Sequence, residues 1–279
     1  MTRPTLLDAD WNFWPDGLAP PAIWATCAEL GFEGIELGVY DPDVELSPSR
    51  VAEAASLARH HGVAVRAALF SMPPARWPDG ALASAEQAPA AVRAIVETGR
   101  RAADLGAEVL GVWPGADRRT GGGDTWARTA DSVAAIVDGV APLGLKVAVE
   151  AKPGQVVGGT EDVLCLCREV GHARLGVLLD TAHALAGGED LDALPERIGA
   201  GLFHVHLGDS AGGDADADLP PGAVHDFAPF LAALDRAGYA HALSFDLYGA
   251  VSTGRLTGEA ASRQGLAHVR AALAAGRRQ

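Results

Sequence analysis

Three apolar stretches decide the fold of this chain: LKVAVEA at 145–151, RLGVLLD at 174–180 and LFHVHLG at 202–208. Their apolar residues are nearly continuous, which is typical of parallel strands that are covered on both faces. Helical spacing precedes each stretch, and Gly144 and Gly171 stand where a helix is expected to end. This part of the chain therefore predicts repeated helix–strand units.

Outward from this region, the same unit recurs to both ends of the chain. Further strands are predicted at 4–9, 33–39, 63–70, 107–113 and 241–248. Helices are predicted at 20–30, 48–61, 86–105, 125–142, 160–170, 190–199, 226–237 and 257–275. A glycine follows six of these helices: Gly31, Gly62, Gly106, Gly144, Gly171 and Gly238. Eight such units in 279 residues match the size of a single (β/α)8 TIM barrel, an α/β fold.

An open, doubly wound sheet is the alternative arrangement of alternating strands and helices. Such a sheet normally carries the nucleotide-binding pattern G-x-G-x-x-G near its first strand, and the sequence lacks this pattern. No linker or shift in composition marks a second domain, so we expect one TIM-barrel domain over residues 1–279. Two longer loops, 114–124 and 209–225, follow strands and would lie at the catalytic face of a barrel.

Composition disfavours several classes of protein. Hydrophobic residues make up 48% of the chain, enough for a core, and the formal net charge of −14 disfavours binding to a nucleic-acid backbone. No apolar run approaches the ~20 residues that span a bilayer, and the N-terminus lacks the apolar segment of a secretion signal. The three cysteines do not suggest a disulfide scaffold. We therefore expect reduced thiols and a cytoplasmic protein without membrane or nucleic-acid partners.

The predicted strands end in polar residues of one chemical kind. These residues are Glu36, Glu150, Asp180, His204, His206 and Asp246. Functional side chains of a barrel lie at the C-terminal ends of different strands, and a buried carboxylate is costly unless it is paired or binds a cation. Four of the residues, on the fifth to eighth strands, could surround one divalent metal ion, for which Mn2+, Co2+, Mg2+ and Zn2+ are all suitable. These four are Glu150, Asp180, His206 and Asp246.

Each of these residues also has an ordinary structural explanation. A single carboxylate at a strand end often caps a helix or forms an ion pair, and a single histidine in an apolar run is often a hydrogen-bonded core residue. For Glu36, an ion pair with Arg66 is one such alternative. The residues by themselves leave a metal site and these structural roles open.

The motifs around these residues resemble one known family. They are VEAKP at 149–153, LDTAH at 179–183, HVHLGD at 204–209, PPGAVHDF at 220–227 and SFD at 244–246. Over essentially the whole chain the sequence is similar to the xylose-isomerase-like TIM barrels, also called the sugar phosphate isomerase/epimerase superfamily. The resemblance implies that one divalent metal ion is bound by Glu150, Asp180, His206 and Asp246. It also implies that His183 and Asp209 contact the substrate or a second metal.

Two departures from the family pattern affect the expected reaction. The family's ketose 3-epimerases have a Glu where this chain has Asp246, whereas its aldose–ketose isomerases have Asp there and a Glu-x-Lys pair like Glu150 and Lys152. The epimerases also carry an Arg soon after the histidine of the seventh strand, and no Arg follows His206 until Arg236. The resemblance therefore implies a different mode of substrate recognition.

The expected reaction moves a proton or hydride next to a carbonyl group. A divalent metal held between two substrate oxygens acts as a Lewis acid, and two acidic groups on opposite faces serve as base and acid. We expect Glu150 and Asp246 in these catalytic roles. Lys152 would lie on the same side of its strand as Glu150 and could polarise the carbonyl. A surface lysine without such a role is the alternative.

Substrate contacts are expected from residues at or beyond the strand ends. The aromatic residues Trp11, Trp14, Phe70 and Trp113 could cover the apolar faces of a sugar and exclude water. Glu36 could accept a substrate hydroxyl. Packing of loops over the barrel mouth is the alternative for the aromatic residues.

Together these features predict a metal-dependent isomerase or epimerase of a sugar, sugar acid or cyclitol ketone, with manganese among the candidate ions. The alternatives are a lyase or dehydratase of a related keto-polyol, an abasic-site endonuclease of the same superfamily, and a barrel that binds a ligand without catalysis. The expected partner is a small polyol or sugar, and the scarcity of Lys and Arg near the strand ends favours one without phosphate. Formation of a homo-oligomer stays open.

Overall fold

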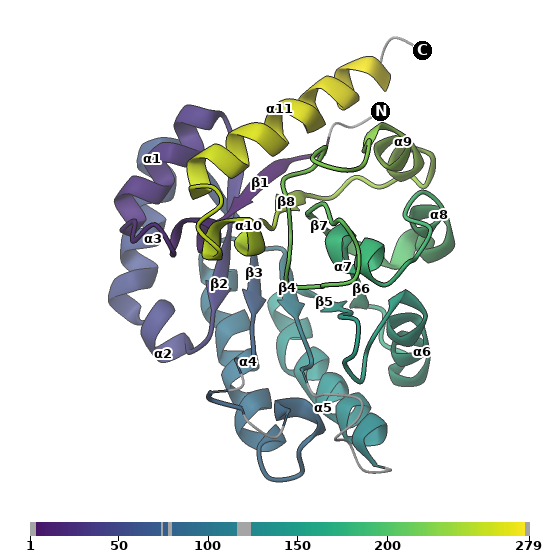
Figure 1. The fold of residues 1–279 in the computed structure, drawn as a ribbon. Helices are drawn as coiled ribbons and strands as arrows, with labels where there is room; N and C mark the ends of the chain where they lie inside the picture. Colours follow the sequence, from purple (N-terminus) through teal and green to yellow (C-terminus); the bar gives the residue numbers. More distant parts are fainter. Residues whose placement is uncertain (1–3, 74, 78–79, 116–123, 277–279) are drawn as a thin grey trace.

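The predicted strands form one closed barrel, in which each strand pairs in parallel with its neighbours in chain order (Figure 1). The structure, a computed structural model, describes residues 4–73, 75–77, 80–115 and 124–276. Its strands are β1 (Leu6–Ala9), β2 (Gly34–Val39), β3 (Ala64–Phe70), β4 (Val109–Val112), β5 (Lys146–Glu150), β6 (Leu175–Asp180), β7 (Leu202–Leu207) and β8 (Leu243–Phe245). The predicted TIM-barrel fold is confirmed. Most of the loop predicted at 114–124 lies outside the described residues.

Helices between the strands cover the outside of the barrel (Figure 1). The longer helices and the helix before β7 are α1 (Pro20–Leu30), α3 (Pro48–His61), α4 (Ala88–Asp104), α5 (Thr125–Val140), α6 (Thr160–Val170), α8 (Leu194–Ile198), α9 (Ala228–Arg236) and α11 (Gly258–Gly276). Short helices are α2 (Pro42–Glu45), α7 (Thr181–Ala186), α10 (Tyr248–Ser252), η1 (Asp10–Phe13), η2 (Ala81–Ala83), η3 (Ala141–Leu143) and η4 (Gly199–Gly201). The helix predicted at 190–199 is shorter, because residues 191–193 form a turn ahead of Pro195 in the first helical turn.

The glycines predicted at helix ends have the expected backbone conformation. All six have positive φ angles, between 66° and 94°. At Gly31, for example, φ is +84° and the N–H donates to the carbonyls of Cys27 and Ala28 at 3.1 and 3.0 Å. This left-handed cap ends α1 and turns the chain towards β2.

Two apolar clusters separate the inside of the barrel from its outside. The interior cluster consists of Leu7, Ala9, Trp11, Ala67, Leu69, Val109, Ala148, Leu178 and Phe203. A larger cluster lies between the strands and the surrounding helices and includes Ile35, Val147, Val149, Val205 and Leu207. Because strand side chains alternate, the outward residues fix which of their neighbours face the barrel axis.

Strand β7 departs from simple alternation at one point. It pairs Leu202 with Val177 and then His204 with Leu178, so that Phe203 is skipped. This β-bulge lets Phe203 and His204 both face the interior, and His206 follows on the same side. The bulge therefore sets two histidines inside the barrel.

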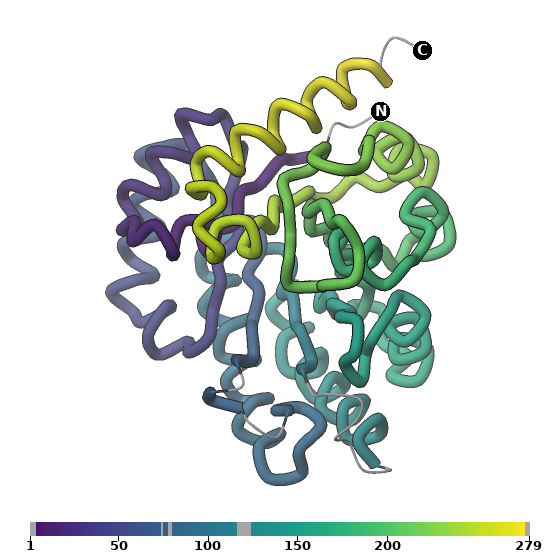
Figure 2. Tube along the Cα trace, in the orientation of Figure 1, coloured from purple at the N-terminus to yellow at the C-terminus, as the bar shows by residue number. Residues whose placement is uncertain are grey.

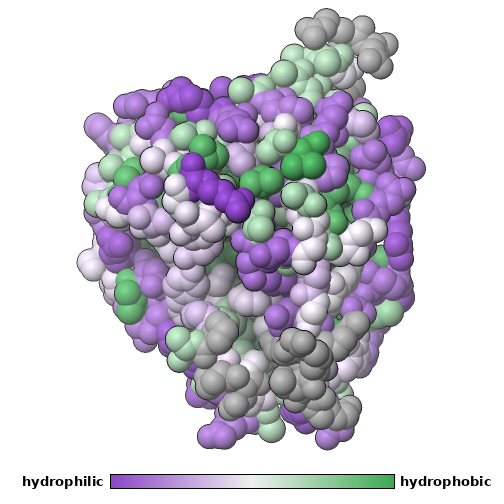
Figure 3. All heavy atoms as spheres, viewed as in Figure 1, coloured by the Kyte–Doolittle hydropathy of each residue, from purple (hydrophilic) through white to green (hydrophobic). Residues whose placement is uncertain are grey.

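The segment between β7 and α9 makes a long excursion before it rejoins the helical layer (Figure 2). The molecular surface on this side is mainly hydrophilic, with apolar residues scattered over it (Figure 3). In the part of the chain that the structure describes, no helix has the length and apolar character needed to cross a membrane.

Candidate metal centre

Four side chains from consecutive strands meet at the C-terminal end of the barrel. They are Glu150 of β5, Asp180 of β6, His206 of β7, and Asp246 directly after β8. One ligand atom from each lies within 4.8 Å of the others. The structure therefore brings together the four residues that the sequence analysis grouped around one metal ion.

Strand alternation aims these side chains inward. Val147 and Val149 pack outward from β5, so Glu150 faces the barrel axis. On β6, Leu178 belongs to the interior cluster, and Asp180 two residues later shares its face. Burial of such polar groups is tolerated where they are paired or bind a cation.

A buried carboxylate lies beneath the cluster and holds two histidines. Glu36 is 0% exposed, and its Oε2 lies 2.8 Å from Nε2 of His204 and 3.2 Å from Nε2 of His206. Burial opposes ionisation of Glu36, but the charges of the histidines and their hydrogen bonds outweigh it and hold the pKa well below its usual range. The alternative ion pair with Arg66 is not formed, because Arg66 pairs with Glu108 at 2.8 Å.

The other ring nitrogen of His206, Nδ1, faces three carboxylates. Nδ1 is buried and accepts or donates no hydrogen bond among the described residues. It lies 3.5 Å from Asp246 Oδ2, 3.8 Å from Asp180 Oδ2 and 3.9 Å from Glu150 Oε1. These separations exceed the length of a good hydrogen bond. They leave a gap bounded by one nitrogen and three carboxylate oxygens.

Two of the carboxylates have one oxygen fixed by the protein and the other turned to the gap. Asp180 Oδ1 accepts from the backbone N–H of His183 at 2.8 Å and so caps α7, while Oδ2 faces His206. Asp246 Oδ1 accepts from Trp11 Nε1 at 2.9 Å, while Oδ2 faces His206. This arrangement prepares each aspartate to offer a single oxygen.

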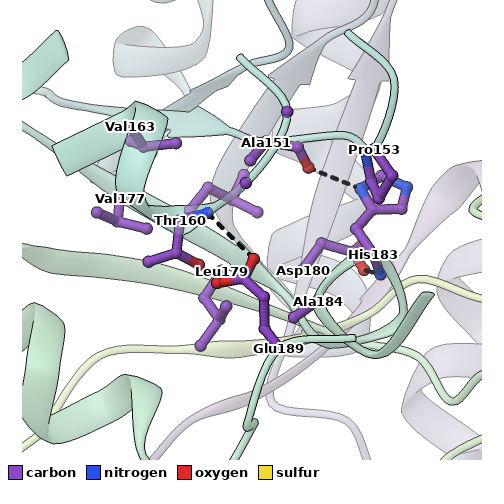
Figure 4. A pocket seen from close by; sticks show the side chains of 13 residues that line it. Ala151, Pro153, Thr160, Val163, Val177, Leu179, Asp180, His183, Ala184 and Glu189 are labelled. Carbon is purple, nitrogen blue, oxygen red and sulfur yellow. Dashed lines mark hydrogen bonds between the residues drawn. The ribbon is translucent and has the colours of Figure 1, made fainter. Parts of the chain in front are cut away.

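His183 supports the cluster from its side. Its Nδ1 lies 3.0 Å from the carbonyl of Ala151 and 3.2 Å from Glu150 Oε1, and Figure 4 shows the ring turned towards Ala151. Burial disfavours its charged form, but the carboxylates of Asp180 and Glu150 outweigh burial and raise the pKa of His183 to about 10. A space of about 10 Å³ lies beside Asp180 and His183, close to the volume that one water molecule needs.

The electrostatic balance of the cluster favours a cation. Burial opposes charge on His206, but Glu36 above all, with Glu150 and Asp246, raises its pKa to about 10. Burial raises the pKa of Asp246 to about 6, and the carboxylates of Asp180 and Glu150 add to that rise against the opposing charge of His206. A positive ion in the gap would relieve the repulsion of Asp246 by Asp180 and Glu150 and could take the place of a proton on His206.

The donor set fits a divalent metal. Three carboxylate oxygens and one imidazole nitrogen suit first-row divalent ions and Mg2+. If a metal ion displaced the proton on Nδ1, the contact of Nε2 with Glu36 would keep the other proton on Nε2, and Nδ1 could then offer its lone pair, as in carboxylate–histidine pairs at metal sites. A second close group, Glu36 with His204 and His206, is joined by contacts of 2.8 to 3.3 Å and leaves no gap for an ion.

Lys152 and Trp113 lie together at the barrel mouth. The ammonium of Lys152 forms an ion pair with Asp216 and lies 4.9 Å from the centre of the Trp113 ring. Burial opposes the charge of Lys152, but the hydrogen bond and charge of Asp216 raise its pKa. The indole Nε1 of Trp113 is buried and has no hydrogen-bond partner in the described structure.

Two of the expected substrate contacts are buried away from the mouth. Phe70 is 0% exposed and packs in the outer cluster, so the expectation that it covers a sugar is wrong. Glu36 is sealed beneath the histidines and cannot accept a substrate hydroxyl at the mouth. Trp14 packs against the interior cluster, lies edge-on to Tyr40 with 5.4 Å between ring centres, and lines a pocket of about 310 Å³ beside β2.

Asp209 organises the long loop after β7. Its Oδ2 accepts from the backbone N–H groups of Val224 and His225 at 2.7 and 2.9 Å, and its Oδ1 lies 2.7 Å from His225 Nδ1. Its backbone exchanges hydrogen bonds with Leu219 at 2.7 and 2.8 Å. The Asp209 carboxylate therefore binds within the loop and does not belong to the four-residue cluster.

Two further residues reach the cluster, and only the first of them was a candidate from the sequence. Trp11 donates to Asp246, and its ring lies 5.8 Å from that of His206. Asp218 is 8% exposed and faces Asp180 and Asp246, although its sequence context predicts a solvated acidic loop. The signal for Asp218 was the Leu-Pro-Pro that follows it, because an apolar, rigid segment returns the chain to the barrel.

Comparisons with known proteins agree with this architecture. The chain aligns by structure with a xylose isomerase-like TIM barrel/4-hydroxyphenylpyruvate dioxygenase fusion protein (TM-score 0.75, 18% identity), covering 95% of this chain and 42% of that protein. It also aligns with D-allulose 3-epimerase from Methylomonas sp. in complex with D-allulose (TM-score 0.78, 17% identity, 97% of each chain). A third match is the IOLI protein with a binding zinc atom (TM-score 0.77, 18% identity, 98% of each chain).

At these identities the solved structures establish the fold alone. A search of curated proteins returns no significant match. The family model described as xylose isomerase-like TIM barrel matches residues 24–272, and this range contains the four clustered ligand candidates as well as His183 and Lys152. The chain therefore belongs to the xylose isomerase-like TIM barrel family.

Proposed function

We propose that this protein is a divalent-metal-dependent isomerase or epimerase of a sugar, sugar acid or cyclitol ketone. One observation carries the proposal: the buried, unpartnered Nδ1 of His206 faces three carboxylate oxygens at 3.5 to 3.9 Å. These four buried groups form no hydrogen bonds with one another at these separations, and a bound ion would satisfy all four. The zinc named in the IOLI structure and the D-allulose named in the epimerase complex support the same assignment.

In this proposal, the ion is held by the four clustered residues: Glu150, Asp180, His206 and Asp246. When bound, Mn2+, Co2+, Mg2+ or Zn2+ would supply Lewis acidity to a substrate carbonyl. Manganese is one candidate among these ions, because oxygen-rich sites with one imidazole do not select strongly between them.

Proton transfer in the proposed reaction falls to the outer two carboxylates. The strands follow one another around the barrel, so Glu150 of β5 and Asp246 after β8 lie at the two ends of the ligand arc, with β6 and β7 between them. A substrate bound at the centre would therefore have one acid on each side, as base and acid chemistry at neighbouring carbons requires. Trp11 holds Asp246 Oδ1 at 2.9 Å and fixes its orientation.

Lys152 follows Glu150 by two residues and points to the same mouth. Its contact with Asp216 leaves it close to the cluster, where it could donate to a substrate oxygen once the ion pair opens. The Glu-x-Lys pair and the aspartate at 246 favour an aldose–ketose isomerase over a simple 3-epimerase. A lyase or dehydratase acting on a related keto-polyol would share these residues, and product analysis separates the reactions.

The first test measures metal content by elemental mass spectrometry after each purified protein is incubated with Mn2+, Co2+, Mg2+ or Zn2+ and desalted. We expect one ion per chain in the wild type and loss of the ion in Asp180→Ala. Asp235→Ala, which removes an exposed aspartate on α9, serves as the matched control and should retain the ion. A wild type that binds none of the four ions would refute the proposed metal centre.

The second test screens the loaded enzyme against ketoses, aldonates and inososes, with product identification by NMR. Glu150→Gln keeps the size of the side chain and removes its basicity, so we expect turnover to fall by at least ~100-fold, a typical contribution of general acid–base catalysis. Retained turnover in this variant would exclude Glu150 as the base.

A further inference from the structure

Asp246 is the one member of the four-residue cluster that lies outside the strands. Strand β8 ends at Phe245, and its pairing with β1 ends there too, opposite Asp8. On the side of β7, the N–H of Asp246 donates to the carbonyl of Leu207 at 3.2 Å. On the side of β1 the ladder has ended, so a contact outside the ladder is needed to fix the backbone around Asp246 on that side.

The side chain of Asn12 in η1 supplies such a contact. Its Nδ2 donates to the carbonyl of Phe245 at 2.8 Å, and its Oδ1 accepts from the N–H of Leu247 at 2.9 Å. Because Phe245 and Leu247 flank Asp246, one carboxamide holds the backbone on both sides of the aspartate. The task requires a donor and an acceptor on one short side chain; an ionised aspartate has no donor, and leucine has neither group.

The second hydrogen of the same Nδ2 fixes the direction in which the carboxamide points. It is donated to Asp8 Oδ1 at 2.8 Å, and the same oxygen accepts from the N–H of Ala9 at 3.1 Å. A reversed amide would place its oxygen against the Asp8 carboxylate and the Phe245 carbonyl, where no donor remains. Asn12 and Asp8 are both 0% exposed, so water does not replace these hydrogen bonds without entering the core.

The neighbouring residue of η1 holds the side chain of the same aspartate. Trp11 donates from Nε1 to Asp246 Oδ1 at 2.9 Å, while Asp246 Oδ2 lies 3.5 Å from His206 Nδ1. A shift of the backbone at 245–247 would move both carboxylate oxygens from these positions. Two adjacent residues therefore hold Asp246, Trp11 through the carboxylate and Asn12 through the backbone.

We infer that Asn12 is a positioning residue for Asp246, which keeps Oδ2 directed at the other three candidate ligands. All three hydrogen bonds of Asn12 are made to the protein, so it acts through Asp246 and not through contact with an ion or a substrate. The inference rests on the proposed function, because it takes Asp246 as a metal ligand. It adds a residue from the turn after β1 to a site built from β5 to β8.

The test is a double-mutant cycle on zinc affinity, measured by competition with a chelator on metal-free protein whose folding is verified by circular dichroism. Groups that orient a ligand typically contribute about 10–100-fold to affinity, and Asn12 acts one step further away, so Asn12→Ala should weaken Zn2+ binding by about tenfold. In the Asp246→Asn background the same change should have an effect of less than about twofold. Equal effects in both backgrounds, or none in either, would overturn the inference, because Asn12 would then not act through Asp246.

The visible absorption spectrum of Co2+-loaded protein gives a second readout, since it depends on the number and arrangement of the ligands. Asn12→Ala should shift this spectrum towards that of Asp246→Asn, and a spectrum identical to that of the wild type would contradict the inference. Ser132→Ala is the matched control, because it removes a buried hydrogen bond of 2.9 Å to the carbonyl of Leu82, between α5 and η2. It should change neither the spectrum nor the zinc affinity.

A second pair of variants tests the contact while Asn12 stays in place. Asp8→Ala removes the acceptor that fixes the carboxamide, and zinc binding should weaken by about threefold. Asp8→Asn keeps an acceptor oxygen of the same reach and should restore the wild-type affinity. These two variants decide the question if Asn12→Ala does not fold, and equal affinities of the two would overturn the inference.

These measurements need no substrate, which separates the inference from the proposed function. Coupling between Asn12 and Asp246 in a protein that turns over no sugar would support the positioning role and contradict the isomerase proposal. Turnover of a sugar by a protein in which the two effects are additive would do the reverse. A wild type that binds no zinc would overturn the inference together with the metal centre on which it rests.

Discussion

A Glu36→Gln substitution tests whether the carboxylate beneath the barrel mouth supports metal binding by His206. Glu36 offers acceptor oxygens to Nε2 of both His204 and His206. Glutamine has nearly the same size but supplies one acceptor oxygen and one donor nitrogen. The N–H group of one histidine would then face the N–H2 group of the glutamine, unless that histidine changed its tautomer. A change in His206 would place its proton on Nδ1, the nitrogen that faces the three carboxylates.

The expected size of the effect follows from the burial of the pair. Loss of the group that orients a ligating histidine typically weakens metal binding by about 10–100-fold, which corresponds to about 1.4–2.7 kcal/mol. Glu36 and His206 are both 0% exposed, so water cannot replace the lost carboxylate without entering the core. We therefore expect the zinc affinity of Glu36→Gln to fall by an amount near the upper end of this range.

The assay is a competition titration of Zn2+ between a chelator and the metal-free protein, with circular dichroism to verify folding at the assay temperature. Glu108→Gln is the matched control, because Glu108 is exposed and precedes β4 at the opposite end of the barrel. An unchanged zinc affinity in folded Glu36→Gln would refute the reasoning, since the carboxylate would then contribute nothing to the ligand. A loss of affinity in Glu108→Gln would indicate a general charge effect instead.

Three further changes have defined outcomes. Burial raises the pKa of Asp10 from the usual 3.8 to about 8. The folded protein therefore holds this proton more tightly than the unfolded chain, and the free energy of unfolding should fall as the pH rises from about 3.8 to about 8. Asp10→Asn keeps an acceptor for Gly38 N–H, and urea unfolding should show a shallower loss of stability with pH; parallel profiles would contradict this. Trp11→Phe removes the 2.9 Å hydrogen bond to Asp246 and should lower turnover more than metal content, measured on the same preparations; equal losses would argue against an orienting role. Gly249→Ala would place a Cβ less than 3.0 Å from the backbone nitrogen of Asp218 and should lower the free energy of unfolding in urea by about 1–3 kcal/mol; unchanged stability would show that the loop moves aside without cost.

Periodicity was sufficient to predict the barrel. The signals for it are local: continuous apolar runs, helices of matching length and glycine caps. The predicted strands and helices agree with those of the structure to within a few residues at each end. The clustering of the four candidate ligands was also predictable, because each stands at a strand end and parallel strands of a closed barrel converge at that edge. These inferences need only the direction of each strand.

Residue exposure in the long loop was not predictable in the same way. Asp214, Asp216 and Asp218 alternate with small residues and look equivalent in sequence. The structure exposes the first two and buries the third, because the backbone contact between Asp209 and Leu219 returns the chain to the barrel at the residue after Asp218. Such a contact joins residues ten positions apart and has no local pattern.

Predictions of whether a strand residue faces inward or outward fail for a different reason, because bulges interrupt the alternation of side chains. On β3 the pairing with β2 skips Arg66, so Val65 and Phe70 both face outward although uninterrupted alternation would place them on opposite faces. On β7 the bulge at Phe203 has the opposite effect and turns a residue inward. If the strand alternated regularly from the outward Leu202, His206 would lie outside the barrel. One inserted residue thus removes Phe70 from the mouth, and another brings His206 to the three carboxylates, so the candidate chemistry depends on a feature that alternation alone cannot reveal.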